Sequence, residues 1–176
     1  SLEHKGPISI RYPRGTGSIA EWEVPFSKIE IGKGRRLTQG DEIAILSIGA
    51  IGTEAAKGVE LLTKKQVSAA HYDMRFVKPL DDVMLHEVFG RFKAVVTVED
   101  GCIQGGFGSA VIEWMVEHGY SSRVTRLGVP DRWIEHGTQA ELYAECGYDY
   151  LSIAEKAEAL TAELGSSGSA SSIQSA

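Results

Sequence analysis

The sequence predicts an α/β protein of three layers, α/β/α, in which helices cover both faces of a mixed, mostly parallel sheet. Residues 43–48 (IAILSI) and 94–98 (AVVTV) are almost wholly apolar, as expected of strands that are buried on both faces. From residue 42 to residue 163, segments with strand character alternate with segments of helical apolar spacing. The composition, 43% hydrophobic and 24% charged, is that of an ordinary soluble globular domain.

The first half of the chain is predicted to contain a βαβ unit. Residues 7–13 form a β-rich run that ends at a proline, and residues 28–34 alternate charged and apolar side chains, which is typical of a half-exposed hairpin strand. A strand over 43–48, a helix over 53–64 and a strand over 67–72 then follow in order. This order indicates two parallel strands joined by a helical crossover.

The second half continues the alternation of strands and helices. Asp81 ends a turn over 76–81 and is predicted to cap a helix over 82–89. Two capping boxes, Thr138 with Glu141 and Ser152 with Glu155, mark the starts of two further helices. The other predicted elements are strands over 94–98 and 123–127, a glycine loop over 99–109 and a helix over 110–118.

Three regions are expected along the chain. Residues 1–22 are interpreted as the last strand of a preceding domain and its linker, and residues 23–164 as the α/β/α domain. Residues 165–176 contain six serines and two glycines with one isolated isoleucine, Ile173. Such a segment cannot bury enough apolar surface to offset the entropy of ordering, so we expect a disordered tail.

Charge and composition exclude several classes of function. The chain has 18 Lys and Arg against 24 Asp and Glu, a formal net charge of −6, so we expect no nucleic-acid or membrane partner. No run approaches the ~18 apolar residues of a membrane span, and the first residues do not have the pattern of a signal peptide, so a cytoplasmic protein is expected. Cys102 and Cys146 do not form a zinc or redox motif and are interpreted as ordinary thiols.

The glycine loop is the first candidate site. Residues 105–109 (GGFGS) follow a strand and precede a helix, an arrangement that allows either an anion site or simply a tight loop with close helix packing. Glu99 and Asp100 lie at the carboxyl end of the same strand, where ligands bind in open α/β sheets. They are interpreted either as acid and base groups or as solvated or capping carboxylates.

The remaining candidates are one histidine and one arginine motif. His136 is the only histidine in a plausible functional loop, with a structural hydrogen bond as the alternative, and no histidine pair has metal-binding spacing, so no metal site is expected. Arg11, Tyr12 and Arg14 follow a predicted strand. Arginine suits a bidentate grip on phosphate or carboxylate, and an interdomain salt bridge is the other interpretation.

Five motifs together resemble the 1-deoxy-D-xylulose-5-phosphate synthase family, whose members are transketolase-like thiamine-diphosphate enzymes. The motifs occur in the family's order over roughly residues 6–163, and the longest of them is specific to that family. The first resembles the end of the pyrimidine-binding domain, and the others resemble the C-terminal domain. They are residues 10–15 (IRYPRG), 73–81 (DMRFVKPLD), 97–100 (TVED), 105–109 (GGFGS) and 127–131 (LGVPD).

The resemblance implies an enzyme that condenses pyruvate with glyceraldehyde 3-phosphate, with loss of CO2, in the biosynthesis of isoprenoids and thiamine. It implies thiamine diphosphate and Mg²⁺ as cofactors of the intact homodimer, in the cytoplasm or, in a plant, in the plastid stroma. The resemblance places the acceptor's phosphate against Arg14, a role that suits charge-assisted hydrogen bonds.

The resemblance also implies that the catalytic and cofactor-binding residues lie in N-terminal domains that are absent from this sequence. The chain alone is therefore expected to be inactive, without bound cofactor or metal, and those domains are its expected partners. The alternatives are a non-catalytic dimerisation or assembly module, the C-terminal domain of a 2-oxoacid dehydrogenase β subunit, and a small anion-binding domain that uses residues 105–109.

Overall fold

A computed structural model describes residues 6, 7, 9, 25 and 27–170 of the chain. The predicted strand over 7–13, with Arg11, Tyr12 and Arg14, and residues 171–176 therefore lie outside the described residues, apart from Pro7 and Ser9. The strands are β1 (Arg35–Thr38), β2 (Ile43–Ile48), β3 (Ala69–Asp73), β4 (Ala94–Cys102) and β5 (Arg123–Val129). The helices are the short 3-10 turn η1 (Gly49–Ile51), α1 (Gly52–Lys64), α2 (Asp82–Arg91), α3 (Phe107–Glu117), α4 (Gln139–Glu145) and α5 (Tyr150–Ala170).

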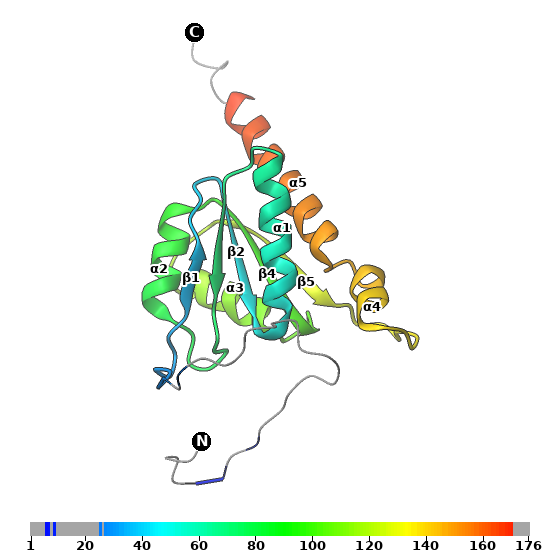
Figure 1. Cartoon of the computed structure of the whole chain (residues 1–176). Helices are drawn as coiled ribbons and strands as arrows, with labels where there is room; N and C mark the ends of the chain where they lie inside the picture. The colour runs from blue at the N-terminus through cyan, green and yellow to red at the C-terminus, as the bar shows by residue number, and fades with distance from the viewer. Residues whose placement is uncertain (1–5, 8, 10–24, 26, 171–176) are drawn as a thin grey trace.

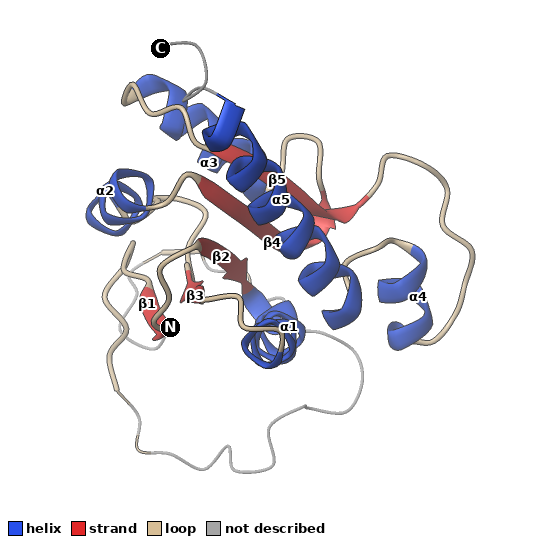
Figure 2. Ribbon diagram, turned by 90° about the horizontal axis from the view of Figure 1, so that it is seen from above, coloured by secondary structure: helices blue, strands red, loops and turns tan. Residues whose placement is uncertain are grey.

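The described strands form one five-stranded sheet in the order β1-β3-β2-β4-β5. Strands β3, β2, β4 and β5 are parallel, and β1 pairs with β3 in the antiparallel direction. Helices α1 and α5 lie on one face of the sheet and α2 and α3 on the other, as Figure 2 shows. The predicted three-layer α/β/α fold with a mixed, mostly parallel sheet is confirmed.

Each face of the sheet has its own hydrophobic core, because successive side chains of a strand point to opposite faces. Ile43 and Ile45 of β2 pack under α1 and α5, whereas Ala44 and Leu46 pack under α2 and α3. All four side chains are fully buried. The continuous apolar run over 43–48 is thus explained by burial on both faces.

The predicted strand over 28–34 is wrong. Gly32 has a φ of +75° in a turn, and the backbone N–H of Lys33 donates to the carbonyl of Glu30. The first strand forms at residues 35–38 instead, where Arg35 lies opposite Asp73 of β3 and its Nε donates to the Asp73 carboxylate over 2.9 Å.

The two predicted capping boxes have different outcomes. Thr138 and Glu141 form the predicted capping box at the start of α4. Helix α5 begins at Tyr150, and its first turn is capped by the Asp149 carboxylate, which accepts from the N–H of Ser152 over 3.0 Å. The predicted box at Ser152 is therefore wrong, because an aspartate three residues earlier caps the helix first.

Helix α5 is also longer than predicted. It continues to Ala170, so residues 165–170 are helical where the sequence predicts a disordered tail. Once a helix has started, each further residue adds a backbone hydrogen bond at little cost, even where serine is frequent.

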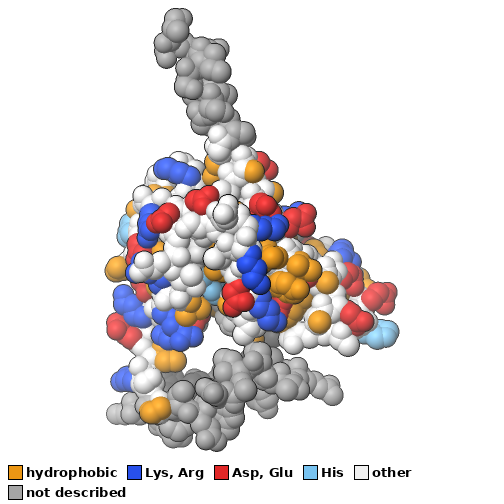
Figure 3. Space-filling model, turned by 45° about the horizontal axis from the view of Figure 1, so that its top comes forward, with side chains coloured by type: hydrophobic (Ala, Val, Ile, Leu, Met, Phe, Trp, Pro, Cys, Tyr) orange, Lys and Arg blue, Asp and Glu red, His pale blue; other side chains and the backbone are white. Residues whose placement is uncertain are grey.

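Acidic and basic side chains are interspersed over the face shown in Figure 3. None of the helices in the described part of the chain is long and apolar enough to cross a membrane. No group of three or more His, Cys, Asp or Glu side chains among the described residues could hold a metal ion.

Candidate functional site

The sheet has a topological switch point between β2 and β4. The chain passes from β2 through α1 to β3 on one side, and then through α2 to β4 on the other side of β2. In open α/β sheets a crevice forms at such a point, outside the carboxyl ends of the strands. A pocket of about 810 Å³ lies there.

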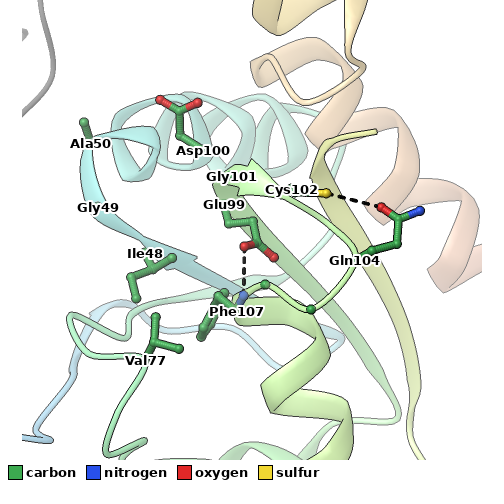
Figure 4. A pocket seen from close by; sticks show the side chains of 12 residues that line it. Ile48, Gly49, Ala50, Val77, Glu99, Asp100, Gly101, Cys102, Gln104 and Phe107 are labelled. Carbon is green, nitrogen blue, oxygen red and sulfur yellow. Dashed lines mark hydrogen bonds between the residues drawn. The ribbon is translucent and has the colours of Figure 1, made fainter. Parts of the chain in front are cut away.

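The pocket is lined mainly by residues at the carboxyl ends of β2 and β4 and in the segments that follow these strands. Ile48, Gly49 and Ala50 come from the end of β2 and from η1, and Val77 comes from the loop after β3. The remaining lining residues, from the end of β4 to the start of α3, are Glu99, Asp100, Gly101, Cys102, Gln104, Gly105, Gly106 and Phe107 (Figure 4). Glu99, Asp100 and most of the glycine loop are thus brought together, as expected.

Glu99 caps helix α3. Its carboxylate accepts from the backbone N–H of Phe107 over 2.8 Å and from that of Gly108 over 2.9 Å. The N-cap residue of α3 is Gly106, which has no side chain to cap the helix, and a Cβ there would lie 2.1 Å from Oε2 of Glu99. The positive end of the helix dipole and two of its free N–H groups are therefore satisfied by this protein's own carboxylate.

The capping supports the interpretation of residues 105–109 as a tight loop. Arg126 of β5 fixes the loop from the other side, since its Nη1 donates to the carbonyl of Ile103 over 2.8 Å and to Oγ of Ser109 over 2.6 Å. The N–H of Gly105 also donates to Oγ of Ser109. An external anion would have to displace Glu99 to reach the helix end.

Asp100 joins β4 to the region around α4. Its two carboxylate oxygens accept from the hydroxyls of Tyr143, over 3.2 Å, and Tyr148, over 3.1 Å. Burial raises the pKa of Tyr143 to about 12, and the charge of Asp100 acts in the same direction. Burial also raises the pKa of Tyr148. Both phenols therefore stay protonated and remain hydrogen-bond donors at neutral pH.

A second polar pair lies inside the core and was missed by sequence reasoning. His71 of β3 is fully buried, and its Nε2 lies 2.8 Å from Oγ of Ser47 on the neighbouring strand β2. Its Nδ1 has no hydrogen-bond partner. Burial lowers the pKa of His71 to about 4, although the charge of Asp73 opposes the shift. His71 is therefore neutral at pH 7.

The other candidates lie apart from the pocket or outside the described residues. His136 is exposed in the loop between β5 and α4 and does not line the pocket. Cys102 is exposed at the pocket, with Sγ 3.5 Å from Oε1 of Gln104, and Cys146 is half-buried next to α4; both are free thiols. Arg14, the predicted phosphate-binding residue, lies outside the described residues.

The family model for the transketolase C-terminal domain matches residues 32–153. The chain is 57% identical over 152 residues to the 1-deoxy-D-xylulose-5-phosphate synthase of Cytophaga hutchinsonii, covering 86% of this chain and 24% of that protein. It is 53% identical over 157 residues to the synthase of Porphyromonas gingivalis, covering 89% and 25%. The chain thus spans about a quarter of the length of these relatives, at their C-terminal end.

Solved structures show the same fold. A split-gene transketolase described as an inactive β4 tetramer superposes with a TM-score of 0.70 at 30% identity, covering 77% of this chain and 45% of that chain. A transketolase from Leishmania mexicana has a TM-score of 0.57 at 14% identity, covering 75% and 18%. The second likeness concerns the fold alone.

Proposed function

The chain belongs to the transketolase C-terminal domain family, and from this premise we propose that it is the C-terminal part of a thiamine-diphosphate-dependent 1-deoxy-D-xylulose-5-phosphate synthase. That enzyme condenses pyruvate with glyceraldehyde 3-phosphate and releases CO2. The observation that carries the proposal is the 57% identity to a synthase over 86% of this chain. Bound thiamine diphosphate would supply the electron sink for decarboxylation.

The described residues do not fit thiamine diphosphate or Mg²⁺. The helix end that could receive a diphosphate, the start of α3, is capped by Glu99. No cluster of carboxylates or histidines among the described residues suits a metal ion. We therefore assign the cofactor to the part of the enzyme that precedes this domain, and no catalytic step to the described residues.

Arg14 is the residue of this chain to which we assign a substrate contact. A guanidinium group forms charge-assisted hydrogen bonds to the phosphate of glyceraldehyde 3-phosphate, each of which contributes about 1.5–3 kcal/mol. In the full-length synthase, Arg14→Ala is expected to raise the KM for glyceraldehyde 3-phosphate about 10- to 100-fold. The KM for pyruvate should change little. Steady-state kinetics with each substrate varied in turn measure both values.

Arg123→Ala is the matched control, because Arg123 is exposed on β5 and pairs with Glu163 on the surface. It should leave both KM values unchanged. An Arg14→Ala enzyme with an unchanged KM for glyceraldehyde 3-phosphate would remove the assigned role of Arg14.

We also propose that the 176-residue chain alone is inactive and acts in assembly. The related split-gene transketolase chain, which is described as an inactive β4 tetramer, supports this view. The purified chain is expected to form no 1-deoxy-D-xylulose 5-phosphate with both substrates, thiamine diphosphate and Mg²⁺ present, and to elute as an oligomer in size-exclusion chromatography with light scattering. Product formation would contradict the first expectation, and a strictly monomeric folded chain the second.

A further inference from the structure

The segment that leads into β1 lies at the carboxyl edge of the sheet. Because β1 is antiparallel to β3, its first residue, Arg35, pairs with Asp73, the last residue of β3. Residues 27–34 therefore reach the sheet at the same edge as the switch-point pocket. We call residues 27–34 the lead-in segment.

The lead-in segment is packed against the loop after β3. A Cβ on Gly32 would lie 2.8 Å from Cγ of Pro79, so backbone and proline ring are in close contact. The N–H of Gly34 donates to the Asp81 carboxylate over 3.0 Å, and Nζ of Lys33 lies 3.6 Å from it. These contacts hold residues 32–34 beside the loop that supplies Val77 to the pocket.

Apolar side chains that are at least partly exposed lie both on this segment and at the pocket. Ile29 is 52% exposed, Ile31 is 74% exposed and Val77, two residues before Pro79, is 39% exposed. Val77 also lines the pocket with Ile48, and both lie beside Phe107 in Figure 4. We call Ile29, Ile31, Val77 and Ile48 the carboxyl-edge strip. Several exposed apolar side chains at one edge of a domain, next to a pocket, are typical of a contact surface.

The polar groups of the pocket favour a protein surface as its occupant. Glu99 is bound to two backbone N–H groups and Asp100 to two tyrosine hydroxyls. Among the described residues, the buried side-chain atoms without a hydrogen-bond partner are Nδ1 of His71 and Oγ1 of Thr97, and neither residue lines the pocket. The carboxylates that could bind a small charged ligand are therefore already hydrogen-bonded within the protein. An apolar surface needs no such hydrogen-bond partners in the pocket.

We propose that the carboxyl-edge strip and the mouth of the pocket are covered by the part of the same polypeptide that precedes the lead-in segment. This inference rests on the proposed function, in which about three quarters of the synthase lies outside this chain. The lead-in segment, through which the preceding part of the polypeptide is covalently attached, reaches the sheet at this edge. The effective concentration of that preceding part there is far higher than that of a separate molecule, so it is the favoured occupant.

Cysteine labelling of the full-length synthase tests the proposal. Ile31→Cys lies in the carboxyl-edge strip, and Val83→Cys lies on α2 outside it; Ile31 and Val83 are similarly exposed in this domain, at 74% and 70%. We expect iodoacetamide to modify the Ile31→Cys thiol at least about tenfold more slowly than the Val83→Cys thiol, since modification at the strip then requires the domains to separate. The native Cys102, exposed at the pocket, should be protected in the same way as the thiol introduced in the strip. Peptide mass spectrometry resolves each site.

Equal labelling rates in the two variants would overturn the proposal. Protection that disappears on dilution, in parallel with dissociation of the oligomer, would assign the strip to a second copy of the chain and would also overturn it. Protection that appears only after substrates are added would assign the site to a ligand and would also overturn the proposal. Labelling requires no catalysis, so it tests the domain contact independently of activity. The proposed function is tested separately: a full-length protein without synthase activity would overturn it.

Discussion

Replacement of Glu99 by alanine is expected to lower the free energy of unfolding of the 176-residue chain by about 3 kcal/mol. The Glu99 carboxylate accepts from the N–H groups of Phe107 and Gly108, and both residues are buried. Alanine leaves these two donors without a partner, at a cost of about 1–3 kcal/mol each. Urea denaturation followed by circular dichroism measures the change.

Glu117→Ala is the control for Glu99→Ala, because Glu117 is an exposed glutamate at the other end of the same helix. It should change stability by less than about 0.5 kcal/mol. Acetate or phosphate should restore part of the stability of Glu99→Ala and none of that of Glu117→Ala, since an external anion can then occupy the vacated helix end. A Glu99→Ala chain as stable as the parent would contradict the capping role.

Acidification is expected to destabilise the chain by about 3 kcal/mol through His71 alone. The pKa of His71 is lowered to about 4 by burial, whereas in the unfolded chain it is near the ordinary value of 6.5. Between these pH values the unfolded state binds the proton and the folded state does not, so stability falls as the pH decreases. The full contribution is present above pH ~6.5 and is lost progressively toward pH ~4.

The pH dependence is measured from the free energy of unfolding at a series of pH values between about 4 and 8. His71→Gln, which cannot titrate, should show a shallower decrease than the parent chain. The carboxylates are the same in both proteins, so their contribution cancels in the comparison. Parallel curves for the parent and His71→Gln would show that His71 does not titrate as assigned.

Much of the fold could be predicted because buried strands and helix faces require apolar residues at regular positions in the sequence. The run over 43–48 is apolar at every position but Ser47, and it forms the central strand β2. The period-two pattern over 28–34 was misleading, because extended structure also needs a pairing partner. The chain turns at Gly32, and pairing with β3 begins only after this turn, at Arg35.

The site was predictable only in part. The order of strand, acidic pair and glycine loop places Glu99 and Asp100 at the carboxyl edge, where the structure has them. The partners of these carboxylates depend on packing between distant segments. Tyr143 and Tyr148 are more than forty residues from Asp100 in the sequence, and no local sequence pattern predicts such a contact. No sequence pattern indicates the contact between Ser47 and His71 either, because it depends on the register between β2 and β3.

The first strand and the last helix both run from the carboxyl edge of the sheet toward the other edge, and this has a practical consequence. The lead-in segment reaches the sheet at its carboxyl edge, whereas α5 extends past the other edge, as Figure 1 shows. An affinity tag placed after α5 would therefore hold the domain on a surface with the pocket facing away from the support. Binding measurements on an immobilised chain should use that end, because a tag joined directly to the lead-in segment would crowd the carboxyl-edge strip.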